Sequence, residues 1–204
     1  MTKIYAALAL AAVAGLLGGT AWSVWQSRSN DIYADCRAGT VGGGEIGGPF
    51  TLMDKTGATV TDKDVITKPT LIYFGYTFCP DVCPLDTARN AEAVDILEEK
   101  GIEVTPLFIS VDPERDTPQV VGEFAANLHP RMIGLTGTAD QVKAASQAYK
   151  TYFKKQDSGD EFYLMDHSTF SYLVLPDTGF VEFYKRDDSA ESIATSAACF
   201  ISKS

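Results

Sequence analysis

A pair of cysteines four positions apart, Cys79 and Cys83, is the feature of this sequence best suited to chemistry. Each is followed by a proline in the stretch FGYTFCPDVCP. Such a pair fits a structural disulfide, a redox-active dithiol or part of a metal site, and its spacing alone does not separate the three. Thiolates are soft ligands that select copper(I), zinc or iron–sulfur clusters, and a third ligand would be needed to enclose the ion.

Two histidines are available as that third ligand. His129, in NLHPRM, stands where an expected helix gives way to a loop, and the sequence favours a surface or capping role for it. His167, in LMDHSTFSYL, directly precedes an expected strand, so its loop could meet the cysteine loop at one edge of a sheet. Met165 is close to His167, but methionines in such positions are more often core residues.

The elements next to the cysteine pair predict where it lies. Residues 70–76, TLIYFGY, are a continuous run of β-formers typical of a buried central strand. A helix is predicted over residues 84–101, and Pro84 suits its first position. Cys83 would then lie at or beside the N-cap, where free N–H groups and the helix dipole favour a thiolate. In open α/β sheets, sites tend to lie beyond the carboxyl ends of central strands.

The rest of the domain predicts a mixed sheet with helices on both faces. Expected strands cover residues 50–54, 58–61, 103–112, 168–176 and 180–186, and expected helices cover residues 117–128, 138–153 and 188–201. The resulting order, β-β-β-α-β-α-α-β-β-α, favours a thioredoxin-like α/β sandwich.

Three regions are expected along the chain. Residues 4–25 carry no charge and have about the length that crosses a hydrocarbon core, so residues 1–25 are predicted to be an N-terminal transmembrane anchor. Trp22 and Trp25 suit a membrane interface and favour an anchor that is not cleaved, while Lys3 keeps the N-terminus cytoplasmic. Residues 26–48 form a glycine-rich tether, and residues 49–204 form the globular domain.

Charge and the remaining cysteines restrict the function further. The net charge of −10 argues against a nucleic-acid partner. Cys36 and Cys199 lie near the two ends of the domain, and a disulfide between them is one of three connectivities that four cysteines allow. Cysteine usage of this kind fits an oxidising compartment.

Four motifs in order, YFGYTFCPDVCP, FISVDPERDTP, IGLTGT and DHSTFSYLVLP, together resemble the SCO/SenC family of membrane-anchored copper-binding proteins, which assist assembly of the binuclear copper centre of cytochrome c oxidase. The resemblance covers residues 48–184. It implies that Cys79, Cys83 and His167 bind one copper ion per chain. Leu85 and Asp86 replace a pair of threonines found in many members, which adds negative charge near the site.

Residues around these ligands have expected supporting roles. Asp81, Asp112 and Asp166 are the candidates for orienting the imidazole of His167. The stretch VDPERDTP could also suggest carboxylate catalysis, but salt bridges to Arg115 and an N-cap for the next helix are the favoured interpretation.

The resemblance implies a metallochaperone that takes copper from a donor protein. It would deliver that copper to the copper-site subunit of cytochrome c oxidase, or reduce the cysteines of that subunit. The alternatives are a thiol–disulfide oxidoreductase with Cys79 and Cys83 as its redox-active pair, and a copper or redox sensor. Three residues between the cysteines, and no proline in MDHST, count against general disulfide exchange. The expected location is a bacterial inner membrane, crossed once, with the domain in the periplasm; the mitochondrial inner membrane facing the intermembrane space is the alternative.

Overall fold

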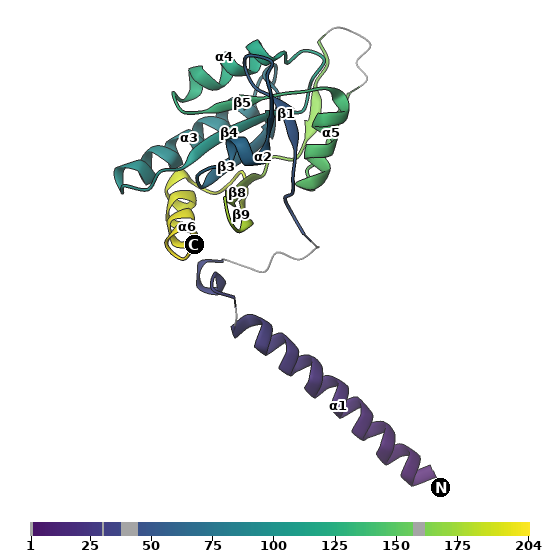
Figure 1. The fold of residues 1–204 in the computed structure, drawn as a ribbon. Coiled ribbons are helices and arrows are strands. Elements are labelled where there is room, and N and C mark those ends of the chain that lie inside the picture. Colours follow the sequence, from purple (N-terminus) through teal and green to yellow (C-terminus); the bar gives the residue numbers. More distant parts are fainter. Residues whose placement is uncertain (1, 30, 38–44, 157–161) are drawn as a thin grey trace. The chain divides into compact units, whose positions relative to one another are not determined.

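A five-stranded mixed sheet forms the core of the larger of the chain's two units, residues 39–202. The computed structural model describes residues 2–29, 31–37, 45–156 and 162–204. The sheet has the strand order β5-β4-β3-β8-β9 (Figure 1). Its strands are β3 (Thr70–Gly75), β4 (Thr105–Ser110), β5 (Ile133–Leu135), β8 (Ser171–Leu175) and β9 (Gly179–Tyr184).

Strand β3 lies at the centre of this sheet, as its sequence predicts. All six of its residues are buried, which suits an unbroken run of β-formers with a packed layer on each face. It pairs in parallel with β4 and antiparallel with β8, so the sheet is mixed. The loop that contains the cysteine pair begins directly after the carboxyl end of β3.

Helices cover both faces of the sheet, which confirms the predicted thioredoxin-like α/β sandwich. Helix α3 contacts both α4 and α6, while α5 contacts β1 and lies on the other side of the sheet (Figure 1). The helices of this unit are α2 (Asp62–Val65), α3 (Val82–Glu99), α4 (Pro118–Leu128), α5 (Ala139–Ala148) and α6 (Ala190–Ser202). The hairpin expected at the start of the domain consists of β1 (Thr51–Met53) and β2 (Thr59–Thr61).

One predicted helix is shorter than its sequence suggests. The pattern over residues 138–153 predicts one helix, but α5 ends at Ala148 and the chain continues into β6 (Phe153–Lys155). Lys150 takes a left-handed conformation with φ 53°, and the amides of Lys150 and Thr151 cap the carbonyls of the last helical turn. A helix normally stops in this way at glycine, so the sequence contained no signal for the stop.

Three short strands were also absent from the predicted order. They are β5, which adds a third parallel strand to the sheet, and the pair formed by β6 and β7 (Met165–His167). His167 was expected in a loop, and it is instead the last residue of β7, opposite Phe153. Strands of only three residues give little periodic pattern, because fewer than two repeats of alternation fit within them.

The N-terminal unit contains helix α1 (Thr2–Ser29) and a 3-10 turn, Ala34–Cys36. Among the helices that the structure describes, none combines the length and the hydropathy of a membrane-crossing segment. Cys79 and Cys83 are free thiols, whereas Cys36 and Cys199 are each disulfide-bonded.

Candidate metal centre

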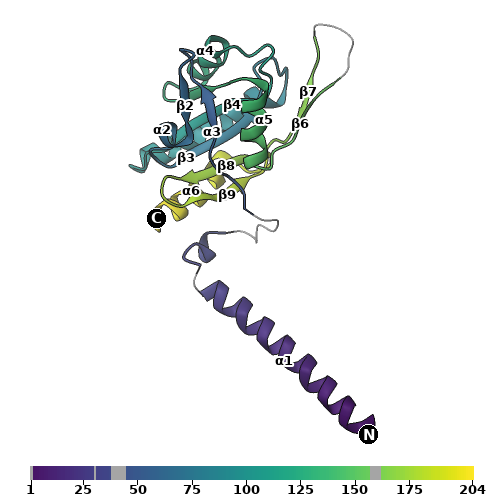
Figure 2. The same cartoon turned by 45° about the vertical axis from the view of Figure 1, so that its right-hand side comes forward.

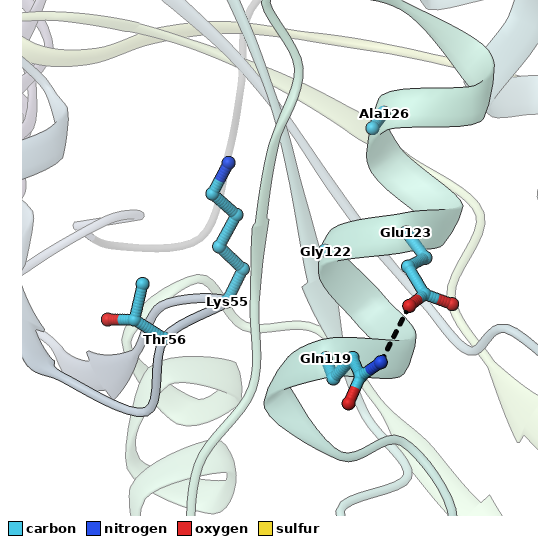
Figure 3. A pocket seen from close by; sticks show the side chains of 6 residues that line it. All are labelled: Lys55, Thr56, Gln119, Gly122, Glu123 and Ala126. Carbon is cyan, nitrogen blue, oxygen red and sulfur yellow. Dashed lines mark hydrogen bonds between the residues drawn. The ribbon is translucent and has the colours of Figure 1, made fainter.

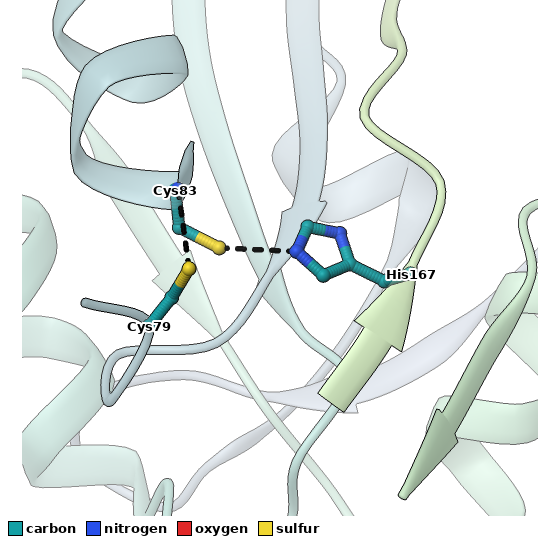
Figure 4. A group of neighbouring side chains, drawn as sticks. All are labelled: Cys79, Cys83 and His167. Atoms are coloured by element: carbon teal, nitrogen blue, oxygen red, sulfur yellow. Dashed lines mark hydrogen bonds between the residues drawn. The ribbon is translucent and has the colours of Figure 1, made fainter. Parts of the chain in front are cut away.

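Three potential metal ligands from separate elements converge at the carboxyl end of β3. Cys79 lies in the loop between β3 and α3, Cys83 in the first turn of α3, and His167 at the end of β7. One ligand atom from each residue lies within 4.8 Å of the other two (Figure 4). The sulfur of Cys83 is 3.3 Å from Nε2 of His167. All three predicted ligands are therefore brought together.

The start of α3 is formed differently from the prediction. The helix begins at Val82, so Cys83 is its second residue and Pro84 its third. Pro84 lacks an N–H, but the first four amides of a helix have no intrahelical acceptor, so no helical hydrogen bond is lost. Asp81 occupies the N-cap position without a side-chain cap, and the amide of Cys83 instead donates to the sulfur of Cys79 at 3.4 Å. The sulfur thus replaces the usual oxygen cap.

The two sulfurs are electrostatically unequal. The pKa of Cys79 is lowered to about 4, first because Cys83 donates a hydrogen bond to its thiolate, and also because the amides of Cys83 and Asp81 do so. The pKa of Cys83 is raised well above its usual range, because it supplies that hydrogen bond and is completely buried. Near neutral pH, the metal-free pair therefore holds one negative charge at Cys79 and one proton at Cys83.

This inequality predicts selective alkylation. Iodoacetamide should modify Cys79 and spare Cys83, since Cys79 is a thiolate with 9% of its surface exposed and Cys83 has none. The rate should be flat between about pH 6 and 8 and fall only as the pH drops through about 4. An unperturbed thiol, with a pKa of about 8.5, would instead react roughly tenfold faster per pH unit in that range. Peptide mass mapping of the labelled chain measures both effects, and equal labelling of the two cysteines would contradict the assignment.

The imidazole of His167 is oriented by backbone rather than by a carboxylate. Its Nδ1 donates to the carbonyl oxygen of Ser168 at 2.9 Å, which leaves the lone pair of Nε2 facing the sulfurs. The expectation that Asp81, Asp112 or Asp166 would do this is wrong for all three. Asp166 accepts from Gln156, Asp112 accepts from Arg115, and Asp81 occupies the N-cap position of α3. A carbonyl one residue further on leaves no trace in the sequence, because every residue has one.

Two tyrosines of the β3 strand and its following loop form the wall beside the ring. Tyr73 and Tyr76 each meet His167 edge-on, with ring centroids 6.2 and 5.7 Å away. The hydroxyl of Tyr73 donates to the buried carboxylate of Asp86 at 3.0 Å. In the sequence, Tyr73 and Tyr76 belong to a run of β-formers, and nothing in the residue pattern indicates that they face a histidine.

The sequence departs from the family pattern at residues 85 and 86, and the added negative charge of Asp86 is buried beside two arginines. Leu85 is exposed, whereas Asp86 is buried with Arg89 at 3.6 Å and Arg186 at 3.9 Å. Burial raises the pKa of Asp86, and the charge of Arg89 opposes that rise. The added negative charge is therefore offset by two guanidinium groups.

His129 lies outside this centre. It takes the C-cap position of α4, which agrees with the expected capping role. It is buried, so the expected surface position is wrong. Its Nδ1 accepts from the amide of Arg131 at 3.1 Å, and Nε2 lies 3.1 Å from a carboxylate oxygen of Asp95. Both ring nitrogens are occupied, so its role is structural.

The acidic stretch after β4 is also structural. Asp116 is buried and accepts from the amide and hydroxyl of Thr77 and from the hydroxyl of Ser110, which ties the cysteine loop to β4. Asp112 pairs with Arg115, and Thr117 caps α4. These contacts confirm the salt-bridge and capping interpretation.

A surface hollow of about 340 Å³ lies elsewhere, between the β1–β2 turn and α4 (Figure 3). Of the described residues that line it, only Lys55 and Glu123 have ionisable side chains, and Glu123 already accepts from Gln119 at 2.8 Å. The hollow is lined by Lys55, Thr56, Gln119, Gly122, Glu123 and Ala126. None of these is a soft ligand or a nucleophile with a neighbouring base, so the cysteine–histidine group remains the candidate functional site.

Known proteins resemble this chain over most of its length. A family model described as SCO1/SenC matches residues 38–202. SenC of Rhodobacter capsulatus is 52% identical over 98% of this chain and 91% of its own length. The mitochondrial SCO1 homolog 1 of Arabidopsis thaliana is 44% identical over 76% of this chain but 46% of its own length, so the chain spans about half of that protein.

Solved structures share the fold. A. thaliana ScoI with copper bound is 42% identical, with a TM-score of 0.72, over 78% of this chain and 97% of that one. Bradyrhizobium japonicum ScoI with copper bound is 39% identical, with a TM-score of 0.67, over 75% and 98%. BsSco, described as a member of the Sco family of cytochrome c oxidase assembly proteins, is 26% identical, with a TM-score of 0.56, over 74% and 94%. Copper is thus the metal held by two relatives with this fold.

Proposed function

The chain belongs to the SCO1/SenC family, and we propose that it binds one copper ion through Cys79, Cys83 and His167 and delivers it to the copper-site subunit of cytochrome c oxidase. The observation that carries the proposal is the convergence of two sulfurs and one imidazole nitrogen within 4.8 Å. Support from relatives comes from the two ScoI structures with copper bound and from the description of BsSco as an oxidase assembly protein.

The donor set fits copper chemically. Two thiolates and one neutral imidazole suit copper(I), and a nitrogen with two sulfurs can also hold copper(II) when one further ligand is added. Nδ1 of His167 is protonated and bonded to Ser168, so Nε2 is already in the form that binds a metal. Cys79 is already a thiolate, whereas Cys83 must give up its proton when metal enters.

The environment of the site suits release as well as capture. Cys79 is at the edge of the buried region, and exposed Phe78 and Leu85 flank the two cysteines, so an acceptor's thiolates can approach from solvent. A site with only three ligands leaves room for an incoming sulfur before an outgoing one departs. Copper therefore need not be free in solution during transfer.

Reduction of the acceptor's cysteines is a second candidate, favoured by the low pKa of Cys79 and the free thiol of Cys83. The Cys79 thiolate would attack one sulfur of the acceptor's disulfide and release the other as a thiolate. Cys83 would then lose its proton and attack the sulfur of Cys79, which breaks the mixed disulfide and releases the acceptor's second sulfur as a thiolate. The acceptor gains two electrons and two thiols, and this chain is left with a Cys79–Cys83 disulfide.

Attachment to a membrane belongs to the same proposal. Its support is the uncharged run of residues 4–25, followed by a polar, glycine-rich segment that would let the domain reach a membrane-bound acceptor. A bacterial inner membrane with the domain in the periplasm is the proposed location, and SenC comes from a bacterium. The mitochondrial relatives make the inner mitochondrial membrane the alternative.

One experiment separates copper delivery from thiol reduction. The reduced full-length chain, loaded with copper(I), is mixed with the metal-free copper-site subunit of an oxidase, once with its cysteines reduced and once with them oxidised. Delivery predicts that the reduced subunit gains copper and the chain loses it, measured by metal analysis after separation. Reduction predicts that the metal-free chain converts the oxidised subunit to dithiol, measured by thiol labelling. A reduced chain that binds no copper would overturn the delivery proposal.

A further inference from the structure

The strand that carries His167 does not belong to the central sheet. Among the strands that the structure describes, β6 and β7 pair only with each other, and the arm they form extends away from the sheet (Figure 2). Two hydrogen bonds between Tyr152 and Ser168 close the base of this arm, but neither joins it to the cysteine loop. The separation between His167 and the two sulfurs therefore depends on side chains that connect the arm to the rest of the site.

Arg115 makes such a connection through both ends of its guanidinium fork. Nε donates to Asp112 at 2.6 Å, and Nη1 donates to the backbone carbonyl of Tyr163 at 2.9 Å. Tyr163 lies in the arm, four residues before His167. The Arg115 side chain is 16% exposed and that of Asp112 only 2%, so the ion pair is largely shielded from water. Charge-assisted bonds of this kind are stronger and more directional than neutral ones.

The same guanidinium also lies over aromatic rings from both ligand-bearing segments. Cζ of Arg115 lies 3.6 Å from the ring centroid of Tyr163 in the arm. It lies 4.9 Å from that of Phe78, the residue directly before Cys79, and 5.7 Å from that of Tyr76. One side chain thus touches the arm of His167 and the loop of Cys79 at once, through contacts that are favourable for a cation on aromatic faces.

Asp112 gives Arg115 a fixed base. Asp112 directly follows Val111 after β4. Its backbone amide is held in place because it donates to the hydroxyl of Ser110 at 3.0 Å. Its second carboxylate oxygen accepts from the hydroxyl of Tyr163 at 2.8 Å. Arm, cysteine loop and central sheet therefore meet at one buried ion pair.

We propose that Arg115 is a positioning residue that clamps the arm of His167 against the cysteine loop and so holds the imidazole within reach of the two sulfurs. For copper as the metal, this inference rests on the proposed function. Copper(I) can be held by two thiolates, whereas copper(II) depends more on the imidazole nitrogen. The clamp therefore contributes more to the binding of copper(II) than of copper(I).

Hydrogen exchange of the metal-free full-length chain tests the clamp without copper. In Arg115→Gln, the amides of residues 163–168 should exchange about tenfold faster, because a charged hydrogen bond to the arm is lost, while those of β3 stay protected. Arg131→Gln is the matched control: it makes the same charge change in an ion pair with Glu98 on the surface. Unchanged exchange in the arm of Arg115→Gln would overturn the proposal.

Copper binding supplies the second readout. Arg115→Gln should weaken copper(II) binding by about 10- to 100-fold and copper(I) binding by less than about threefold, measured by competition with chromophoric chelators. Arg115→Lys should lie between, because lysine keeps the charge but not the fork. Equal losses for both oxidation states would contradict positioning through His167.

A further variant covers the case in which Arg115→Gln does not fold. Phe78 is 53% exposed, so Phe78→Ala should leave the fold intact while removing one wall of the clamp. It should weaken copper(II) binding in the same direction by a smaller factor, and no change would count against the clamp. A wild-type chain that binds no copper would refute the proposed function, and hydrogen exchange would still decide the role of Arg115.

Discussion

His167→Ala is expected to weaken copper(II) binding by more than about 100-fold, because loss of a direct ligand should exceed the roughly 10- to 100-fold cost of losing a supporting group. Nε2 of His167 is 3.3 Å from the Cys83 sulfur, and His167 is the only histidine in the group of potential metal ligands that the described residues form. The effect is measured by competition with a chelator and by the change in the sulfur-to-copper(II) absorption band. Copper(I) binding should fall less, since both thiolates remain.

The other histidine, His129, provides a control variant that should affect stability but not copper binding. His129→Ala should leave copper binding unchanged, because its ring is bonded to Asp95 and the amide of Arg131. It should lower the free energy of unfolding by roughly 1–3 kcal/mol, because a buried ring is removed and the partly buried amide of Arg131 loses its acceptor. His167 is only partly buried, so its removal should cost little stability. Equal copper affinities for the two variants would refute the assignment of His167 as the ligand.

The central part of the fold was predictable because its signals are local and long. β3 is an unbroken run of β-formers, and α3 and α4 carry helical periodicity over three or more turns, so their approximate extents follow from the sequence. The end of α5 was not predictable, since it depends on a left-handed Lys150 where glycine would be the usual signal. The three-residue strands β5, β6 and β7 are specified by their partners across space, which a single sequence does not display.

The candidate site also has a part that the sequence predicts, its ligands, and a part that it does not, the residues that orient them. Cys79, Cys83 and His167 could be named from their residue types and from the order of motifs around them. Their support could not, because it comes from contacts between distant segments. Ser168 orients the imidazole through a backbone carbonyl, and Arg115 reaches the arm across 48 positions of sequence. Residue types predict what a site can bind, whereas the partners that aim its ligands depend on tertiary packing.

Oxidation of the cysteine pair should abolish copper binding, and reduction should restore it. The two sulfurs lie within 4.8 Å of each other, Cys79 is a thiolate near neutral pH, and Cys83 supplies the second sulfur. A Cys79–Cys83 disulfide has no thiolate, so the site loses its charge and two of its three ligands. We expect the oxidised chain to retain less than about one tenth of the copper bound by the reduced chain at equal free copper.

Mass spectrometry and a single variant make this result specific. Oxidation of the pair lowers the mass by two hydrogens, and peptide mapping distinguishes it from changes at Cys36 and Cys199, which are already disulfide-bonded. Cys79→Ser cannot form the disulfide, so its weaker copper binding should not change further with the oxidant. Full copper binding by a completely oxidised chain would show that the thiolates are not the ligands. If copper binding is lost on oxidation and recovered on reduction, the redox state of this pair is the condition for copper binding. The metal role and the redox role, which the C-x3-C spacing leaves open, would then belong to the same pair of cysteines.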